Sequence, residues 1–240
     1  MNQLLSKVLD AHGGLDTWKK YSIISPTLTF GGLAFKSKLN NQGLTKRTLN
    51  ISTTMPRVVF NDYPSIGFSG IFTKDKVWIE TEKGGVTSLR ENPRDAFKTF
   101  RHNFYWDDLD LLYFAGYASW NYFNSPFLLS YPGVEVEELD LWNENNEEWY
   151  RLSVKFPATI PTHSNHQVFY FDKNFQMRRF DYCPEVFAKW ARGAHYCSHY
   201  LNWNGITIPS KRKVVPNGPD NKSKNFPTLV WIKVSNVKFE

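Results

Sequence analysis

Two long stretches of the chain, residues 26–91 and 134–239, alternate apolar and polar side chains with a period of two. Such alternation is typical of strands that bury one face of a sheet. Short turn sequences rich in Gly, Asn and Pro separate the segments and are too brief to hold crossover helices. The pattern therefore predicts an antiparallel meander of about eleven or twelve strands. The candidate strands are residues 28–38, 46–62, 66–72, 77–82, 86–91, 134–141, 149–156, 167–172, 177–182, 195–203, 206–215 and 228–239.

Two other segments follow the spacing of a helix. Residues 2–20 carry an apolar stripe, and Gly13-Gly14 offers this helix an end or a break. Residues 93–129 contain the longest helix-like segment, which lies between the two strand-rich stretches. Further aromatic side chains surround its apolar face, which predicts a helix covered on most sides. The face with i, i+3, i+4, i+7 spacing is formed by Leu109, Leu112, Tyr113, Gly116, Trp120 and Phe123.

The order of these elements predicts one mainly β domain that spans residues 1–240. A continuous antiparallel sheet of this size curls towards a barrel. We therefore expect a large curved sheet that forms an open or half β-barrel, preceded by the N-terminal helix. The aromatic helix within residues 93–129 then acts either as a lid over a ligand or as a plug that permanently fills the barrel.

Composition and charge narrow the classes of partner. Aromatic residues make up 17% of the chain, which suits either a ligand cavity or an aromatic-rich β core. The net charge is +6, but Lys and Arg are scattered apart from Lys211-Arg212-Lys213, so we expect no nucleic-acid partner. An anionic membrane surface is no better supported. The sequence does not indicate an oligomeric state.

Two further features bear on location and redox chemistry. Cys183 and Cys197 do not make a disulfide framework. The first residues lack the apolar segment of a secretory signal, and no run of about 18 apolar residues is present. These features lead us to expect a cytoplasmic protein without a transmembrane segment.

The sharpest local prediction comes from Asn204-Gly205, the strongest two-residue signal for a type I′ hairpin turn. If Trp203 pairs with Ile206, the cross-strand partners of this hairpin share a face. One face is apolar near the turn and carries few charges farther along, so we expect it to point inward. Its residues are Trp203, Ile206, Leu201, Ile208, His199, Ser210, Cys197, Arg212 and His195.

Three interpretations of this polar patch remain open. It is a buried network in which Arg212 pairs with an acid such as Asp181, or it is the polar end of a ligand pocket. The third interpretation is a metal site formed by His195, Cys197 and His199. Donors at alternate positions of one straight strand span about 13 Å, so that site requires a bulge.

Two other stretches carry candidate chemistry. In residues 177–182, Arg178 and Tyr182 share one face, whereas Arg179 and Asp181 share the other. Arg178 then reaches a ligand, or Asp181 pairs with a neighbouring base. In residues 162–167, His163 follows Thr162 and precedes a serine, but no Gly-x-Ser-x-Gly motif is present, so we interpret this segment as the polar start of a strand. Phosphate loops, dinucleotide motifs and paired cysteines are missing too, so we expect no cofactor and no metal.

The order of a leading helix, an unclosed antiparallel sheet and a helical insertion resembles the fold of the lipoprotein carriers LolA and LolB and of the mycobacterial LppX-type lipid-binding proteins. The likeness covers almost the whole chain as topology and includes no specific shared motif. It implies binding of a lipid-like molecule and assigns a role to no residue. Some stretches also look like those of a group of bacterial proteins without assigned function: Ala11-His-Gly-Gly14, Gly116-Tyr-Ala-Ser-Trp120, Pro126-Phe-Leu-Leu129, residues 162–167 and Asp181-Tyr182.

Three functions fit these features. The first is binding of a hydrophobic or amphipathic small molecule, lipid-like or an apolar metabolite, between the sheet and the aromatic helix. The second is an enzyme that isomerises or cyclises an apolar metabolite with His199 or His195 and Asp181 as acid–base groups. The third is a structural or interaction module whose barrel is filled. The candidate ligand-binding residues are Tyr113, Tyr117, Trp120, Phe123, Leu201, Trp203, Cys197, Arg212, Arg178 and Tyr182.

Overall fold

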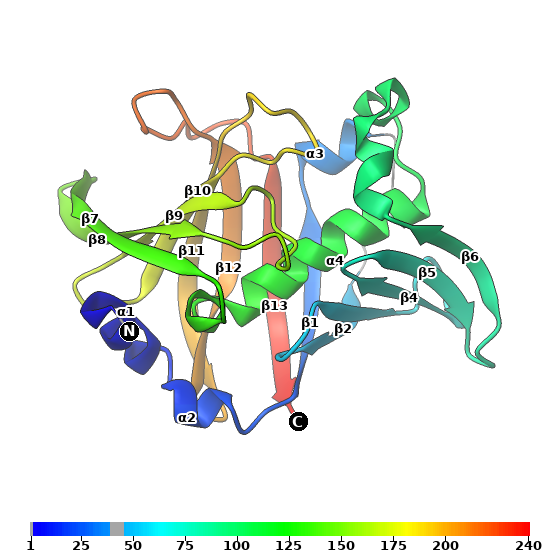
Figure 1. Ribbon diagram of the computed structural model, residues 1–240, viewed down its shortest axis with the longest axis horizontal. Coiled ribbons are helices and arrows are strands. Elements are labelled where there is room, and N and C mark those ends of the chain that lie inside the picture. Colours follow the sequence, from blue (N-terminus) through cyan, green and yellow to red (C-terminus); the bar gives the residue numbers. More distant parts are fainter. Residues whose placement is uncertain (1, 39–45) are drawn as a thin grey trace.

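The computed structural model describes residues 2–38 and 46–240. In these residues, 13 strands form one sheet in the order β6-β5-β4-β3-β2-β1-β13-β12-β11-β10-β9-β8-β7 (Figure 1). The predicted mainly β class and the open, curved sheet are confirmed, because the edge strands β6 and β7 do not pair with each other. The strands are β1 Ile23–Gly31, β2 Arg47–Ser52, β3 Arg57–Asn61, β4 Phe68–Thr73, β5 Lys76–Thr81, β6 Val86–Glu91, β7 Glu135–Glu144, β8 Glu147–Lys155, β9 His166–Phe171, β10 Met177–Tyr182, β11 Gly193–Trp203, β12 Ile206–Pro216 and β13 Val230–Phe239.

The first and last strands join the two halves of the sheet. β1 pairs with β13 in antiparallel register from Ile24↔Phe239 to Gly31↔Trp231, with one register shift after Thr27. Strands β1–β6 form one meander and β7–β13 the other, so this single pairing makes the sheet continuous. It also places the apolar side chains of β1 beside those of β13, with Leu28 opposite Val234 and Phe30 opposite Ile232.

The structure places three element boundaries more exactly than the sequence does. The helix predicted for residues 2–20 breaks at Gly13-Gly14, as expected for one alternative, into α1 Gln3–Ala11 and α2 Leu15–Trp18, because Gly13 and Gly14 adopt positive φ values of 117° and 80°. The strand predicted for residues 28–38 ends at Gly31, since Gly32 at φ 137° turns the chain into α3, Leu33–Lys36.

The strand predicted for residues 46–62 is also divided, into β2 and β3. Pro56 lies at the break and cannot donate a hydrogen bond to the sheet. The turn predicted at residues 40–43 lies outside the described residues.

The connection between β6 and β7 crosses the concave face, because these strands are the opposite edges of the sheet (Figure 1). It contains the 3-10 turns η2 Pro93–Lys98, η3 Phe100–Asn103 and η4 Phe127–Ser130, and the long helix α4, Asp108–Asn124. No helix in the described ranges is long and apolar enough to cross a membrane.

The start of α4 is anchored to the edge strand β6. Asp107 caps the helix by accepting from the backbone N–H of Asp110, while the Asp110 carboxylate accepts from the backbone N–H of Asp107. Arg90 of β6 forms ion pairs with both carboxylates. The fully buried Asp110 carboxylate also lies 2.9 Å from Nε2 of His102. Asp107 and Asp110 therefore fix the start of α4, where acidic side chains suit the positive end of the helix.

The other end of α4 is held by β2 and by the N-terminal helices. Nε1 of Trp120 donates to the backbone oxygen of Ser52 at 3.0 Å, and Nδ2 of Asn124 donates to the same oxygen at 3.2 Å. Beyond the helix, Phe127 stacks on Trp18 with the ring centroids 4.3 Å apart. Both ends of α4 are thus attached to the sheet or to the helices that cover it.

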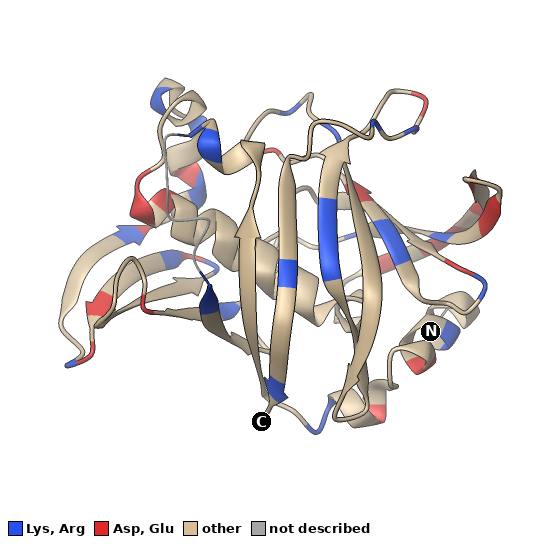
Figure 2. Ribbon diagram, turned by 180° about the vertical axis from the view of Figure 1, so that it is seen from behind, with Lys and Arg blue, Asp and Glu red and all other residues tan. Residues whose placement is uncertain are grey.

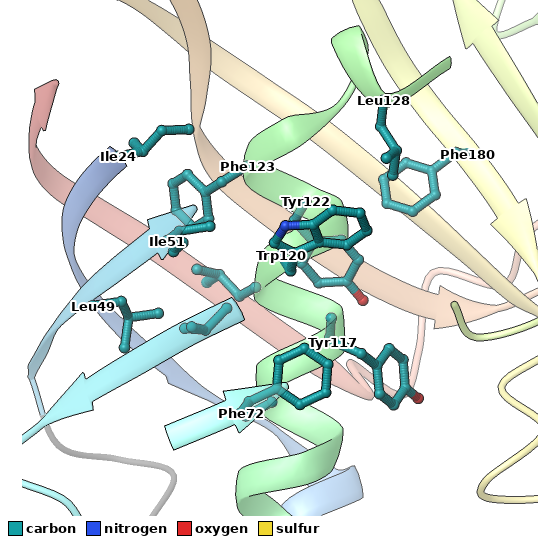
Figure 3. Packing of buried hydrophobic residues seen from close by; sticks show 14 of the residues in the cluster. Ile24, Leu49, Ile51, Phe72, Tyr117, Trp120, Tyr122, Phe123, Leu128 and Phe180 are labelled. Carbon is teal, nitrogen blue, oxygen red and sulfur yellow. The ribbon is translucent and has the colours of Figure 1, made fainter. Parts of the chain in front are cut away.

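The middle of α4 approaches β4 closely at Gly116. A Cβ atom built there would lie 2.4 Å from Cγ of Phe72, which is nearer than real Cβ atoms approach a neighbour. Figure 3 shows Phe72 next to this helix, and Phe123 beside Ile24 of β1 and Ile51 of β2. Nearly all side chains of α4 are buried, as predicted, and the helix packs mainly on β2–β5.

Replacing Gly116 with Ala is expected to lower the free energy of unfolding by about 1–2 kcal/mol, because overpacking costs about 1–3 kcal/mol and better helix propensity offsets about 1 kcal/mol of it. Urea unfolding measures this change. In a Phe72→Ala background the loss caused by Gly116→Ala should shrink, since Cγ and Cδ2 of Phe72, two of the three atoms nearest to the new methyl group, are gone. An unchanged or increased stability of Gly116→Ala in the wild-type background contradicts the close approach.

Candidate functional site

A cavity of about 660 Å³ lies between α4 and the part of the sheet formed by β1, β12 and β13. The helix contributes the face opposite to the one that packs on β4, and this face has small side chains at Ala115, Ala118 and Ser119. Larger apolar side chains of the sheet stand across from them. The walls are formed by Leu28, Phe30, Phe35, Phe114, Ala115, Ala118, Ser119, Phe123, Phe187, Val214, Leu229, Val230 and Ile232.

The mouth of this cavity is the end at which its lining residues are exposed. Leu33 of α3 and Trp190 of the β10–β11 loop line the cavity with side chains that are 48% and 86% exposed. Arg192 and Lys224, both exposed, complete this rim. The mouth therefore combines an apolar rim with two cations.

Three buried polar residues form what we call the cavity floor: Tyr122, His163 and Tyr182. Nε2 of His163 lies 2.7 Å from the Tyr122 hydroxyl, which lies 3.1 Å from the Tyr182 hydroxyl. On the other side of the imidazole, Nδ1 lies 3.0 Å from the hydroxyl of Tyr117. The four side chains thus form one hydrogen-bonded chain that reaches the cavity at Tyr182.

The position of His163 depends on α4 and on β10. Nδ2 of Asn121 donates to the backbone oxygen of Pro161 at 2.7 Å and so holds the loop that carries His163 against the helix. The imidazole stacks on the ring of Tyr182 with a centroid distance of 4.1 Å and an interplanar angle of 6°. The floor is therefore assembled from α4, one loop and β10.

Burial keeps the whole floor uncharged. It lowers the pKa of His163 from 6.5 to about 3, with a further contribution from the positive charge of Arg94. Burial also raises the pKa of Tyr117 and Tyr122 well above the usual value, and it raises the pKa of Tyr182. At neutral pH the floor offers neutral donors and acceptors, which can bind a ligand oxygen or pass a proton along the chain.

A second polar group, His195 and Arg212, lies behind the floor and does not line the cavity. The His195 ring stacks on Phe180 at 4.2 Å, and neither ring nitrogen has a hydrogen-bond partner in the described part of the chain. Burial lowers the pKa of His195 well below its usual value, aided by the charge of Arg212. The guanidinium of Arg212 donates to the backbone oxygen of Tyr122 at 2.6 Å and to Sγ of Cys197 at 3.3 Å.

The predicted pairing of Asp181 with Arg212 is wrong, whereas its alternative pairing with a neighbouring base is present. Asp181 binds Arg179, with Oδ1 2.7 Å from Nε, on the face of β10 opposite to Phe180. Because Phe180 is paired with His195 in the sheet, His195 lies on the other face from Asp181. Asp181 therefore assists neither histidine nor Arg212, and the acid–base trio is not assembled.

The predicted inward position of His199 is wrong as well, although the hairpin register around it is confirmed. His199 adopts a left-handed φ of 56°, which turns its side chain outward. Its ring nitrogens lie 3.1 Å from Oγ of Ser198 and 3.2 Å from Nζ of Lys211, both on the face assigned to solvent. Leu201 is also 50% exposed rather than enclosed. Within residues 2–38 and 46–240 no three His, Cys, Asp or Glu side chains are placed to hold a metal.

The structure brings only two of the predicted ligand-binding residues to the cavity, Phe123 and Tyr182. Arg178 instead lies 3.3 Å from a carboxylate oxygen of Asp172, beside a register shift in β10. The other predicted residues do not line this cavity: Tyr113, Tyr117, Trp120, Leu201, Trp203, Cys197 and Arg212.

Sequence analysis missed Tyr122 and His163. A signal for Tyr122 existed, because Phe114, Ala118 and Tyr122 follow helical spacing on a second face with a small residue at its centre. His163 gave no comparable signal, since its place depends on the contact between Asn121 and Pro161, which are far apart in the chain.

No protein-family model matches the sequence, and no curated protein matches it. The structure is similar to a LolA superfamily protein of Nitrosomonas europaea, with a TM-score of 0.53, 8% identity, and coverage of 99% of this chain and 93% of the other. It has a LolA-like fold.

Two further solved structures agree with this fold. A DUF1329 family protein of Desulfovibrio piger has a TM-score of 0.52 and 12% identity over 99% of this chain and 92% of its own. A domain named for outer membrane lipoprotein sorting, from Vibrio parahaemolyticus, has a TM-score of 0.50 and 12% identity over 96% and 93%. The predicted LolA-like topology is thus confirmed at the level of the fold.

Acidification is expected to destabilise the LolA-like domain through its buried histidines. Burial lowers the pKa of His12 to about 4 and that of His163 to about 3, whereas both take up a proton near pH 6.5 when unfolded. Their stabilising contribution is complete above pH 6.5 and is lost as the pH falls towards the folded-state values. Each of the two histidines should lower the free energy of unfolding by about 2 kcal/mol when the pH falls from 7 to 5.

Urea unfolding at both pH values, with His163→Gln and the exposed control His166→Gln, measures this effect. His163→Gln should lower the number of protons taken up on unfolding by about one, and His166→Gln should leave that number unchanged. If the free energy of unfolding changes equally with pH in the wild type and in His163→Gln, a neutral, buried His163 is contradicted.

Proposed function

We propose that this protein binds a hydrophobic or amphipathic small molecule, lipid-like or an apolar metabolite, in the cavity beside α4. One observation carries the proposal: about 660 Å³ of space lies among apolar walls and opens to solvent at one end. Ligand pockets typically span about 300–1,000 Å³ and combine apolar walls with a few placed polar groups. A barrel filled by its own helix has no such space, so the observation disfavours a purely structural role.

The energetics of the cavity favour a long apolar chain. Burying one methylene group contributes about 0.8 kcal/mol, and several of them offset the freedom that a ligand loses on binding. The small residues Ala115 and Ala118 provide the space along the helix, and Phe30 and Ile232 provide contacts from the sheet. The ligand body therefore lies along α4 without displacing it.

The mouth suits the polar group of an amphipathic ligand. Arg192 and Lys224 are exposed there, so an anionic group can remain partly hydrated while it contacts a cation. Figure 2 shows that Lys and Arg elsewhere are spread over many elements, among them the central strands β12 and β13, which carry no Asp or Glu. The likeness to a domain named for lipoprotein sorting supports the proposal as an analogy of fold, because lipoproteins carry apolar acyl chains.

A series of linear fatty acids tests the cavity, with affinities measured by displacement of a fluorescent apolar probe. Each added methylene should improve affinity about fourfold until the chain reaches the cavity floor. Replacing Ala118 with Leu should shorten this limiting length by about three carbon atoms, because the new side chain occupies that much of the cavity. Shorter acids should bind as they do to the wild type.

The control is Ala158→Leu, since Ala158 is exposed and lies outside this cavity. It should leave the whole series unchanged. Thermal unfolding confirms that Ala118→Leu is folded and at least as stable as the wild type, since filling a cavity usually stabilises. The proposal fails if affinity does not depend on chain length, or if Ala118→Leu and Ala158→Leu give identical series.

A further inference from the structure

The cavity floor differs from its walls in one respect: it ends the hydrogen-bonded chain Tyr117–His163–Tyr122–Tyr182 inside an apolar space. Tyr182 lines the cavity, and in the described residues its hydroxyl has one partner, the Tyr122 hydroxyl at 3.1 Å. A phenol hydroxyl can donate once and accept twice. The hydroxyl of Tyr182 therefore keeps hydrogen-bonding capacity that a molecule in the cavity can use.

The donor-to-acceptor direction of this series of hydrogen bonds can reverse, because a neutral imidazole donates from only one nitrogen. With the proton on Nε2, His163 donates to Tyr122, Tyr122 donates to Tyr182, and the Tyr182 proton remains for a ligand. With the proton on Nδ1, Tyr182 donates to Tyr122 and Tyr122 donates to Nε2, so the lone pairs of Tyr182 remain. The floor can thus serve a ligand oxygen that accepts, donates or does both.

Charge distribution separates the floor from the mouth. The floor is neutral, and the nearby cation Arg212 does not line the cavity because the backbone oxygen of Tyr122 and Sγ of Cys197 engage its guanidinium. A carboxylate at the floor would lose its hydration without gaining a cation, which is costly. The exposed Arg192 and Lys224 place that group at the mouth instead.

We propose that the cavity floor is a recognition site for an uncharged oxygen, a hydroxyl or a carbonyl, on an otherwise apolar ligand. This inference rests on the proposed function and names the ligand class: oxygenated apolar molecules. The Tyr182 hydroxyl makes the contact, and Tyr122 and His163 are positioning residues that set its direction. A site built to bind an oxygen discriminates against an analogue that lacks it, because its buried polar groups are then left unpaired.

The test compares 1-decanol, 2-decanone, decane and decanoic acid on wild type and Tyr182→Phe by displacement of a fluorescent apolar probe. Tyr182→Phe should weaken the binding of 1-decanol and 2-decanone about tenfold, which is the usual effect of losing one hydrogen bond to a neutral group. Decane and decanoic acid should bind Tyr182→Phe at least as tightly as the wild type, since neither places an oxygen at the floor and the variant leaves no Tyr182 hydroxyl unpaired. Tyr150→Phe is the matched control, because Tyr150 stacks on Phe175 away from the cavity and should change nothing.

A spectroscopic measurement on the wild type does not depend on the folding of any variant. The carbonyl infrared band of ¹³C-labelled 2-decanone should shift to lower frequency on binding, as it does when a carbonyl accepts a hydrogen bond. Tyr122→Phe, which removes the link between Tyr182 and His163, should reduce that shift. A band at the position seen in alkane solvent overturns the inference.

Two results of the binding comparison also overturn this inference. One is an equal loss of affinity for 1-decanol and decane in Tyr182→Phe, and the other is no loss of affinity for either. Both leave the proposed function intact, since the wild type still binds. If no member of the set binds the wild type, the proposed function itself fails and this inference fails with it.

Discussion

The placement of α4 across the concave face is the constraint on which the rest of the structure depends. The helix connects the two edge strands, so it has to cross the sheet, and it is held at both ends. Arg90 binds the carboxylates of Asp107 and Asp110 at its start, and Ser52 accepts from Trp120 and Asn124 near its end. Gly116 then lets the helix contact Phe72 on one side. Because it rests against β2–β5, its other side cannot also fill the space beneath β1, β12 and β13.

This arrangement shows that α4 is neither a simple lid nor a plug that fills the whole concave face. On one side α4 is part of the core, and on the other it is the wall of a cavity. Ala115 and Ala118 are the residues that make the difference, because larger side chains there would close the space. The same helix carries Tyr122, so the apolar wall and the polar floor are positioned by one element.

Local interactions explain what could be predicted from the sequence. The hairpin register around Asn204-Gly205 is determined by a two-residue turn, and the structure has the predicted pairs Trp203↔Ile206 and Cys197↔Arg212. The covered helix and the open antiparallel sheet follow from periodicity alone. His199 shows where prediction from periodicity fails, because alternation along a strand cannot indicate that one residue adopts a positive φ.

The candidate site was harder to predict because it depends on contacts between distant parts of the chain. The pairing of β1 with β13 decides which strands face α4, and no local pattern specifies it. Asn121 brings the His163 loop to the helix by one hydrogen bond to Pro161. The alternation in residues 177–182 does not indicate which face points inward, so Asp181 remains a candidate partner of Arg212 in the sequence, whereas in the structure it binds Arg179 on the face opposite to Phe180.

Photo-crosslinking tests the central claim, that an apolar ligand occupies the space between α4 and the strands β1, β12 and β13. A long-chain alcohol with a diazirine group in its chain would be bound, irradiated and located by peptide mass spectrometry. We predict labels on α4 around Ala118 and Phe123, and on the facing strands around Leu28, Val214 and Ile232. Labels confined to α1, to the hairpin around Asn204 or to the opposite face of the sheet would contradict the account.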